Sequence, residues 1–330
     1  MTSNKIKTDQ IEELFDHELL YSATRVIISD GLVSERVIEK FSRLPHLEEL
    51  ELSIDTVCGD TKNLYKLTNI KKLNINNCEL ETLPQDIYSL TNLTHLQVYN
   101  TGLNTLSENL GNLINLVELD FSDEGNLSTL PKSITKLKNL KCLRLGLNNF
   151  EKFPQEILEL TQLEELDLEY NAIEAIPEEL KELKNLKSLS IDLPEDVNCI
   201  DDICTLDNLE FLSISGFVSD ETMQKICTLT TLTSLDINNS NLSYIPKEIS
   251  NLKNLTKLKL NFNQIHSVPS EIGDLVMLEH LELTENNLVD LPIEIERLEY
   301  LKHLYIRDNP FNLLLPQFLN KLKYRVKVTI

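Results

Sequence analysis

The stretch that decides the fold runs from residue 255 to residue 300. It contains one pattern twice, LTKLKLNFNQIHSVPSEIGDLVM at 255–277 and LEHLELTENNLVDLPIEIERLEY at 278–300. In both copies aliphatic residues stand at the first, fourth and sixth positions, an asparagine at the ninth and an aliphatic residue followed by proline at the fourteenth and fifteenth. The chain therefore contains a repeat of 23 residues, and such a period is typical of solenoid proteins.

The same period extends through most of the 330 residues. Every step between repeat starts is 23 residues except the step from Leu116 to Leu140, which is 24 because the segment 122–126 holds one extra residue. The twelve starts are Leu47, Ile70, Leu93, Leu116, Leu140, Leu163, Leu186, Leu209, Leu232, Leu255, Leu278 and Leu301.

Elementary physical chemistry explains the pattern. The alternation in Leu258-Lys259-Leu260 directs two side chains into a core and the middle one to solvent, as a strand requires. One repeat cannot bury its apolar face alone, so neighbouring repeats stack and their strands pair in parallel. Proline suits the first position of a helix, so the segment after each aliphatic–proline pair is predicted to be a short helix.

The ninth position predicts a ladder of buried amides between neighbouring repeats. It fails in the repeats that start at Leu186 and Leu209, which also lack the Leu-Pro pair, so we expect irregular outer segments there. One explanation is that the repeat sequence has diverged over residues 192–224 and has repacked locally. The alternative is that these residues form a bulge that recognises a partner. The ladder residues are Asn148, Asn171, Asn263, Asn286 and Asn309, and the bulge would expose Leu193, Glu195, Asp196, Asp201, Asp202 and Phe211.

From about Ala23 to the C-terminus the sequence resembles the leucine-rich-repeat family. The form is LxxLxLxxNxLxxLPxxIxxL, the 23-residue type of intracellular Ras-group-like and bacterial members, as in Leu83-Pro84-Gln85-Asp86-Ile87. The resemblance implies an α/β solenoid, the leucine-rich-repeat horseshoe, with a parallel β-sheet on the concave face and short helices or irregular segments on the convex face. It also implies protein binding without catalysis.

The two ends depart from the repeat, as the exposed ends of a solenoid core require. Residues 1–46 are predicted to form an N-terminal helical cap, with a helix from Asp9, and a degenerate first repeat with Val26 and Ile28 in its strand. Residues 47–322 form the twelve repeats. Residues 323–330 form a C-terminal capping strand whose basic residues Arg325 and Lys327 would discourage edge pairing.

The bulk composition limits the classes of partner. A formal net charge of −22 repels phosphate backbones and anionic lipid, so we expect neither nucleic acid nor a membrane as partner. No apolar run of about 18 residues or secretory signal is visible, and six scattered cysteines form no CxxC pair. We expect a cytoplasmic monomer without cofactor or metal, or a protein exported without a signal peptide.

In the geometry that the resemblance implies, the second, fourth, sixth and seventh residues after each repeat start line the concave face. One acidic group stands out there, and adjacent carboxylates repel one another, so a partner with a basic surface would explain their proximity. The acidic group is Glu118, Asp120, Ser122, Asp123, Glu165, Asp167 and Glu169, interrupted only by Arg144. Exposed aromatic anchors are predicted at Tyr99, Tyr170, Phe211, Phe262 and Tyr305.

The face changes character toward the C-terminus, and the change could orient a partner. His280 and His303 share one offset on neighbouring repeats with Glu282 nearby, but a metal site lacks a third ligand, and repeats align like residues by construction. The face positions there are Lys257, Lys259, Asn261, His280, Glu282, His303, Tyr305 and Arg307.

No nucleotide-binding loop, GxSxG elbow or HExxH motif is present, so an enzyme is not expected. Three hypotheses stay open. The first is a scaffold or adaptor that holds a protein on its concave face. The second is a bacterial effector or surface virulence factor that binds a host protein through the same face, and the third is a structural, self-associating solenoid.

Overall fold

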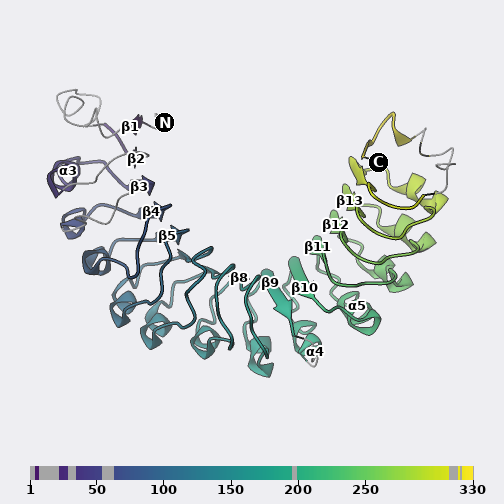
Figure 1. The fold of residues 1–330 in the computed structure, drawn as a ribbon, viewed down its shortest axis with the longest axis horizontal. Helices are drawn as coiled ribbons and strands as arrows, with labels where there is room; N and C mark the ends of the chain where they lie inside the picture. The colour runs from purple at the N-terminus through teal and green to yellow at the C-terminus, as the bar shows by residue number, and fades with distance from the viewer. Residues whose placement is uncertain are drawn as a thin grey trace. The chain divides into compact units, whose positions relative to one another are not determined.

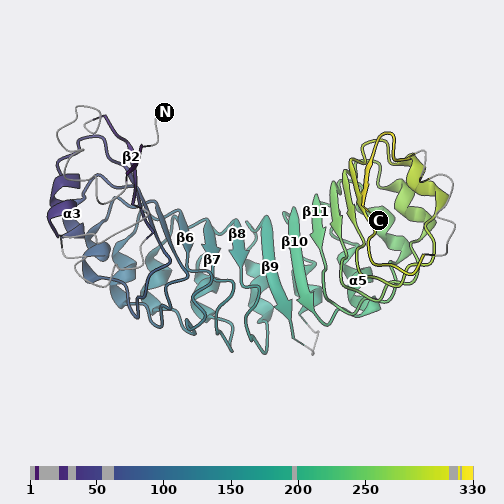
Figure 2. The same ribbon diagram turned by 45° about the horizontal axis from the view of Figure 1, so that its top comes forward.

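The computed structural model describes residues 4–6, 22–28, 35–53, 63–194, 199–311, 319 and 322–329. The chain forms two compact units, Met1–Ala172 and Ile173–Ile330, called unit 1 and unit 2 below. Within each unit, successive coils place their strands side by side on one face and their short helices on the opposite face (Figures 1 and 2). The leucine-rich-repeat solenoid predicted from the sequence is confirmed.

The strands of unit 1 pair in parallel in the order of the sequence. Core aliphatics pair with core aliphatics, as in Leu96 with Leu119 and Leu143 with Leu166, so the 23-residue period sets the register. The strands are β1 Asn4–Ile6, β2 Arg25–Ile28, β3 Glu49–Ser53, β4 Lys72–Asn76, β5 His95–Tyr99, β6 Glu118–Asp120, β7 Cys142–Arg144 and β8 Glu165–Asp167. Strand β1 was not predicted from the repeat.

Unit 2 follows the same plan, and its strands also pair in parallel. They are β9 Ser188–Leu193, β10 Phe211–Gly216, β11 Ser234–Asp236, β12 Lys257–Lys259, β13 His280–Glu282, β14 His303–Tyr305 and β15 Lys327–Thr329. In both units the aliphatic residues of the first, fourth and sixth repeat positions are buried between the strands and the outer helices.

The segments after the aliphatic–proline pairs are five-residue 3-10 helices, as the short-helix prediction required. The proline lies one position earlier than expected, because Pro84 is the N-cap with extended backbone and its carbonyl accepts the first bond, from the N–H of Ile87. The 3-10 helices are η2 Leu64–Lys66 (three residues, without proline), η3 Gln85–Ser89, η4 Glu108–Asn112 (without proline, N-cap Ser107), η5 Lys132–Lys136, η6 Gln155–Glu159, η7 Glu178–Glu182, η8 Lys247–Asn251, η9 Ser270–Asp274 and η10 Ile293–Arg297.

The prediction of irregular outer segments in the repeats starting at Leu186 and Leu209 is wrong. These coils carry the α-helices α4 Ile200–Ile203 and α5 Asp220–Ile226. Helix α5 begins without proline, because its N-cap is Ser219, whose hydroxyl accepts the N–H of Thr222 at 3.1 Å. The 3-10 helix η4 begins in the same way, with Ser107 as N-cap.

The strands of these two coils are also longer, with six residues each. Their last pair is Leu193 with Gly216, where a Cβ on Gly216 would lie 2.6 Å from the Leu193 carbonyl, so only glycine fits. Leu193 is 4% exposed and is therefore not the exposed recognition residue expected. Asp201 is exposed, Asp202 and Phe211 are half-buried, and Glu195 and Asp196 lie outside the described residues.

The predicted amide ladder is confirmed at all five asparagines. Asn286 is typical: its Nδ2 donates to the carbonyls of Leu260, Leu283 and Thr284 at 2.8–3.3 Å, and its Oδ1 accepts the N–H of Ile265 at 3.0 Å. The other members are Asn148, Asn171, Asn263 and Asn309. These bonds satisfy backbone groups that the coil turns would otherwise bury unpaired.

In the 24-residue repeat the ladder position holds Glu124, which is 4% exposed. Its Oε2 accepts the N–H and hydroxyl of Thr101 and the N–H of Leu103 at 2.8–3.0 Å, while its buried Oε1 has no hydrogen-bond partner among the described residues. Burial raises the pKa of Glu124, against the lowering effect of these donors. A protonated acid supplies a hydroxyl donor where the other coils have an amide N–H.

At the ends, β2 and the helix α3 Glu35–Phe41 occupy the predicted first repeat, whereas the helix expected from Asp9 lies outside the described residues. Strand β15 is shorter than expected: Tyr324 is exposed in a turn, and Arg325 donates to the carbonyls of Glu296, Leu298 and Glu299 at 2.8–3.4 Å. Arg325 therefore bonds the last turns instead of guarding a sheet edge.

Candidate protein-binding surfaces

Two groups of side chains on the strand faces are charged in opposite senses. We define the β6–β8 surface as the second, fourth and sixth residues after the repeat starts Leu116, Leu140 and Leu163. We define the β12–β15 surface as the corresponding positions from the repeat at Leu255 to strand β15. The charged members of the first are Glu118, Asp120, Arg144, Glu165, Asp167 and Glu169, and those of the second are Lys257, Lys259, His280, Glu282, His303, Arg307 and Lys327.

Arg144 is the centre of the β6–β8 surface. Its Nη1 lies 2.7 Å from Glu118 Oε1 and 3.7 Å from Asp120 Oδ2, and its Nε lies 2.7 Å from Glu165 Oε1. Three strands are thus joined through one guanidinium. The expectation that Arg144 only interrupts the acidic group is wrong, because the Arg144 side chain holds the carboxylates of Glu118, Asp120 and Glu165 together. Five carboxylates and one guanidinium still leave a formal charge of −4.

The carboxylates of this surface titrate differently. Burial raises the pKa of Glu118, but the hydrogen bond and charge of Arg144, with the bond from Gln97 Nε2 at 2.9 Å, outweigh burial and lower it overall. Burial raises the pKa of Asp167, and nearby Asp120 adds to this effect. Relative to its ordinary pKa, Glu118 therefore keeps its charge to lower pH, whereas Asp167 loses its charge at higher pH.

The seventh residue after many repeat starts forms a left-handed turn just after the strand. In unit 1 these residues include Asn100, Asp123 and Tyr170, with φ of 54°, 58° and 60°. Asparagine and aspartate tolerate this conformation, whereas a bulky aromatic residue rarely adopts it. Tyr170 is also 62% exposed beside Glu169, so neither burial nor backbone preference accounts for a tyrosine there.

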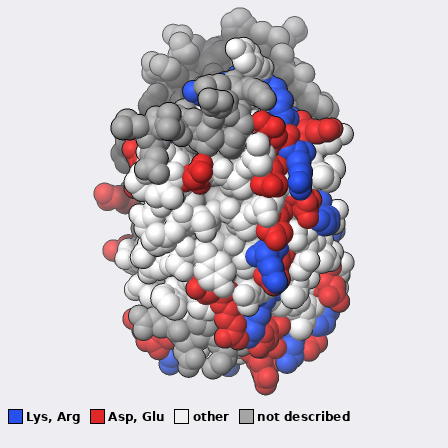
Figure 3. Space-filling model, turned by 90° about the vertical axis from the view of Figure 1, so that its right-hand side faces the viewer, with Lys and Arg blue, Asp and Glu red and all other residues white. Residues whose placement is uncertain are grey.

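The β12–β15 surface has a row of four residues in register: Lys257, His280, His303 and Lys327. The rings of His280 and His303 stack with centroids 4.6 Å apart and planes 7° apart, and the Tyr305 ring lies 5.9 Å from that of His303. Figure 3, which faces the side with the C-terminal coils, shows basic and acidic side chains interleaved along one border of the molecule.

The remaining predicted site residues fall into neither group. Tyr99 on β5 and Phe211 on β10 are half-buried, and Phe211 pairs in register with Ser188 and Ser234. Phe262 is 52% exposed in the left-handed turn after β12. The structure thus brings the charged predictions together but leaves these aromatic residues dispersed.

Sequence reasoning missed neighbours that belong to the charged surfaces. His95 Nε2 lies 3.8 Å from Glu118, but in the sequence His95 stands apart from the acidic group. Lys327 completes the basic row, but in the sequence it belongs to the predicted capping strand. It also missed a second row of amides. The asparagine before many repeat starts donates to a carbonyl of the preceding coil at 2.8–3.1 Å, at Asn92, Asn115, Asn139, Asn208 and Asn254.

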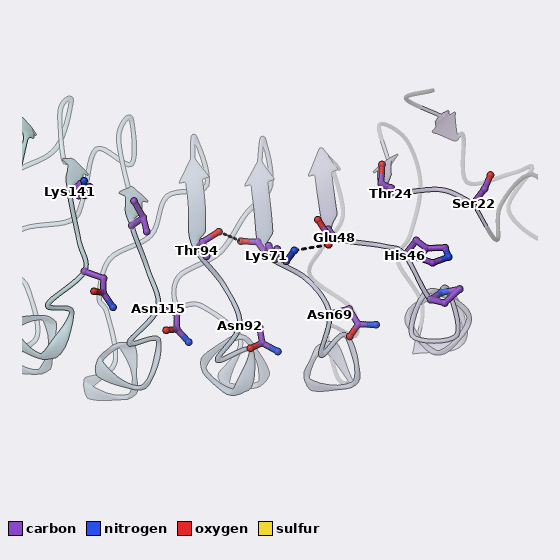
Figure 4. A pocket seen from close by; sticks show the side chains of 13 residues that line it. Ser22, Thr24, His46, Glu48, Asn69, Lys71, Asn92, Thr94, Asn115 and Lys141 are labelled. Carbon is purple, nitrogen blue, oxygen red and sulfur yellow. Dashed lines mark hydrogen bonds and ion pairs between the residues drawn. The ribbon is translucent and has the colours of Figure 1, made fainter. Parts of the chain in front are cut away.

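Three members of this second row, Asn92, Asn115 and Asn139, line an open groove of about 910 Å³ in unit 1 (Figure 4). Asn69, Asn92 and Asn115 lie one per coil below the strands, and Lys71 bonds Glu48 at 2.6 Å. The Nδ2 groups of Asn92 and Asn115 are already bonded to backbone, so the groove is a by-product of coil stacking.

Among the residues that the structure describes, no group of three or more His, Cys, Asp or Glu could hold a metal ion. The five described cysteines are free thiols. Burial raises the pKa of Cys227 to about 12 and that of Cys204 to about 11, so these thiols are not reactive nucleophiles. None of the described helices is both long and apolar enough to span a bilayer.

Comparison with known proteins agrees with the coil architecture. A family model described as a leucine-rich repeat region matches residues 85–261, and a second described as a leucine rich repeat matches residues 253–311. The chain belongs to the leucine-rich-repeat family. No curated protein matches the chain.

Solved structures show the same fold. A leucine-rich-repeat protein of Leptospira interrogans is 26% identical, with 100% of both chains covered and a TM-score of 0.66. An internalin (inlF) of Listeria monocytogenes is 24% identical, with 98% of this chain and 94% of that one covered and a TM-score of 0.75.

The ectodomain of the Arabidopsis thaliana receptor kinase GASSHO1/SCHENGEN3, in complex with Casparian strip integrity factor 2, is 23% identical. The match covers 86% of this chain and 35% of that one, with a TM-score of 0.61. Family and fold together suggest a protein-interaction scaffold, although fold alone names no partner.

Proposed function

We propose that the protein is a non-enzymatic scaffold or adaptor whose β6–β8 surface holds a protein partner with a basic surface. The observation that carries the proposal is the cluster around Arg144, where five carboxylates on neighbouring strands keep a formal charge of −4. Like charges on adjacent strands are unfavourable, and a cationic partner relieves that repulsion.

Tyr170 supports the same proposal. It is largely exposed, it lies in a backbone conformation that tyrosine rarely adopts, and it borders the acidic cluster. An exposed tyrosine at the rim of a charged surface is a typical interface anchor, because it supplies a large contact area at low entropic cost.

The proposal extends to location. We place the protein in the cytoplasm, where its free thiols are stable, and we expect it to act as a monomer. Cell fractionation tests the location, since recovery from the medium or the cell surface would favour the exported alternative. Light scattering tests the oligomeric state.

The test of the surface compares wild type with the triple variant Glu165→Lys, Asp167→Lys, Glu169→Lys. The matched control is Glu81→Lys, Glu151→Lys, Glu159→Lys, which makes the same charge change at exposed positions of unit 1 away from the strand face. A fluorescent decalysine peptide serves as a defined probe, and immobilised proteins are used to capture partners from lysate.

We expect the wild type and the control to bind decalysine and to retain the same partner, whereas the face variant loses both. The association rate should fall on the order of tenfold or more and depend on salt, and the dissociation rate should change less. Equal retention by the face variant and wild type would show that the surface is misplaced.

A further inference from the structure

The row Lys257, His280, His303 and Lys327 runs across four adjacent parallel strands and contains no carboxylate. Neighbouring strands lie about 4.8 Å apart, so the four side chains form a basic line on the order of 15 Å long. Over the second, fourth and sixth residues after the repeat starts at Leu255, Leu278 and Leu301 and the matching residues of β15, three lysines and Arg307 lie near one glutamate, Glu282. This is a formal charge of +3 in a chain of −22, and the turns beyond the strands hold Glu285 and Asp308.

Four carboxylates near this row are already engaged. Glu282 Oε2 accepts Asn261 Nδ2 at 2.9 Å, and Glu279 accepts the Lys302 ammonium at 2.6 Å on the strand edge. Asp236 pairs with Lys259 at 2.8 Å, and Asp308 pairs with Arg307 at 3.0 Å. Lys257 and Lys327, by contrast, form no ion pair with any residue of the described ranges.

The imidazole of His280 makes the charge of the row depend on pH. Burial lowers the pKa of His280, and the charges of His303 and Lys257 lower it further, against Glu279 and Glu282. On strand β15 the row continues with another cation, Lys327. Protonation of His280 therefore places a new positive charge beside Lys257 and the stacked His303 ring, and an external anion would stabilise it.

We propose that the β12–β15 surface is a second docking site, for an acidic segment of a partner protein, and that it binds more tightly as the pH falls through the histidine range. The surface lies wholly in unit 2, so its test does not depend on the β6–β8 surface. A nucleic acid is the less favourable ligand, because a long phosphate backbone would extend beyond the row along a protein of charge −22.

The probe is a fluorescent decaglutamate peptide, with decaglutamine as the uncharged comparison, measured by anisotropy at low salt near pH 6 and near pH 8. The test variant is Lys257→Glu, Lys327→Glu. The control is Lys184→Glu, Lys253→Glu, two exposed lysines of unit 2 that share one repeat position before the strands and lie off their face. Thermal melts of all variants confirm that they fold.

We expect wild type and control to bind decaglutamate on the order of tenfold more tightly near pH 6 than near pH 8, and the test variant to lose binding at both. The variant His280→Gln, His303→Gln should keep the affinity of the higher pH and lose the pH dependence. Equal losses in test and control variants, absence of wild-type binding near pH 6, or an unchanged pH dependence without the histidines would each overturn the proposal. Tighter binding of a thymidine decanucleotide than of decaglutamate would overturn the choice of partner.

Discussion

The β6–β8 surface of unit 1 and the β12–β15 surface of unit 2 occupy the same repeat positions and carry opposite charge. Behind both, the buried positions are nearly interchangeable: Leu119 and Leu143 in unit 1 do what Leu258 and Leu281 do in unit 2. The repeat thus separates two requirements. Buried positions specify the coil, and face positions can change sign without disturbing it. The ladder position is where this separation fails, because Glu124 introduces an ionisable group into the interior of unit 1.

The largest expected effect comes from transplanting that ladder chemistry into unit 2 with Asn286→Asp. The change removes an amide that donates to three carbonyls and adds a carboxylate at a buried site. We expect the free energy of unfolding to fall by about 3 kcal/mol near pH 7. Because burial raises the pKa of such an acid, part of the loss should be recovered as the pH falls toward the ordinary value of about 4.

Urea denaturation at several pH values measures this effect. Asn286→Ala is the matched control, since it removes the same donors without adding a titratable group. A loss that is equal in the two variants at every pH would mean that the site is open to water in solution.

The second prediction concerns the cation at the centre of the β6–β8 surface. Arg144→Met leaves Glu118, Asp120 and Glu165 without their shared partner and should cost about 2 kcal/mol. Lys259→Met, which breaks the ion pair with Asp236 in unit 2, should cost about 1 kcal/mol or less.

The pH dependence of the second prediction has a defined sign. The folded-state pKa of Glu118 is lowered, so the stability that Arg144 confers is present above the ordinary glutamate pKa of about 4.3 and is lost as the pH falls through the folded value. Denaturation of both variants near pH 7 decides the comparison. Equal costs would mean that Arg144 acts as an ordinary surface cation.

The third prediction reverses the first. Glu124→Gln places an amide where the buried acid lies, so near pH 7 it should stabilise the protein by about 1 kcal/mol. The folded-state pKa of Glu124 is raised, so its contribution to stability is full below the ordinary pKa of about 4.3 and is lost as the pH rises through the folded value.

Wild-type stability should therefore fall more steeply than that of Glu124→Gln as the pH rises from the ordinary glutamate pKa of about 4.3 toward neutral pH. Calorimetry across this range measures the difference. Glu108→Gln is the control, because Glu108 is exposed and its pKa is lowered, chiefly by the hydrogen bond from the backbone N–H of Ser133. The same substitution there removes no carboxyl whose pKa is raised by burial. Parallel pH profiles of wild type and Glu124→Gln would show that Glu124 does not titrate in this range.

These comparisons show how far the sequence predicts the structure. Core and ladder positions were predictable, because burial and backbone satisfaction restrict residues such as Leu258 and Asn286 to a few types. Helices α4 and α5 were not, because their coils lack the aliphatic–proline pair that marks a helix start in most repeats, and Ser219 caps α5 instead. The division at residues 46 and 322 stays a prediction.

The face was predictable only in part. Offset from the repeat start shows which residues share a surface, so Glu118 and Glu165 were grouped correctly. It does not show which side chains bond across strands, so the central position of Arg144 needed coordinates. The offset also does not assign Lys327 to the basic row, because Lys327 pairs with His303, which precedes it by 24 residues and not by 23.

The smallest expected effect tests whether the turn after each strand was shaped by folding or by binding. Asparagine occupies this left-handed position at residues 77, 100 and 239, so Tyr170→Asn should relieve backbone strain and stabilise the protein by about 0.5 kcal/mol. The same change removes a largely exposed ring beside the acidic cluster and should weaken retention of the proposed partner.

Phe262→Asn is the matched change in unit 2, and it should bring a similar gain in stability without affecting decalysine binding. Thermal melts and anisotropy on both variants measure the two effects. A Tyr170→Asn protein that is more stable and binds as well as wild type would mean that the tyrosine has no role in docking.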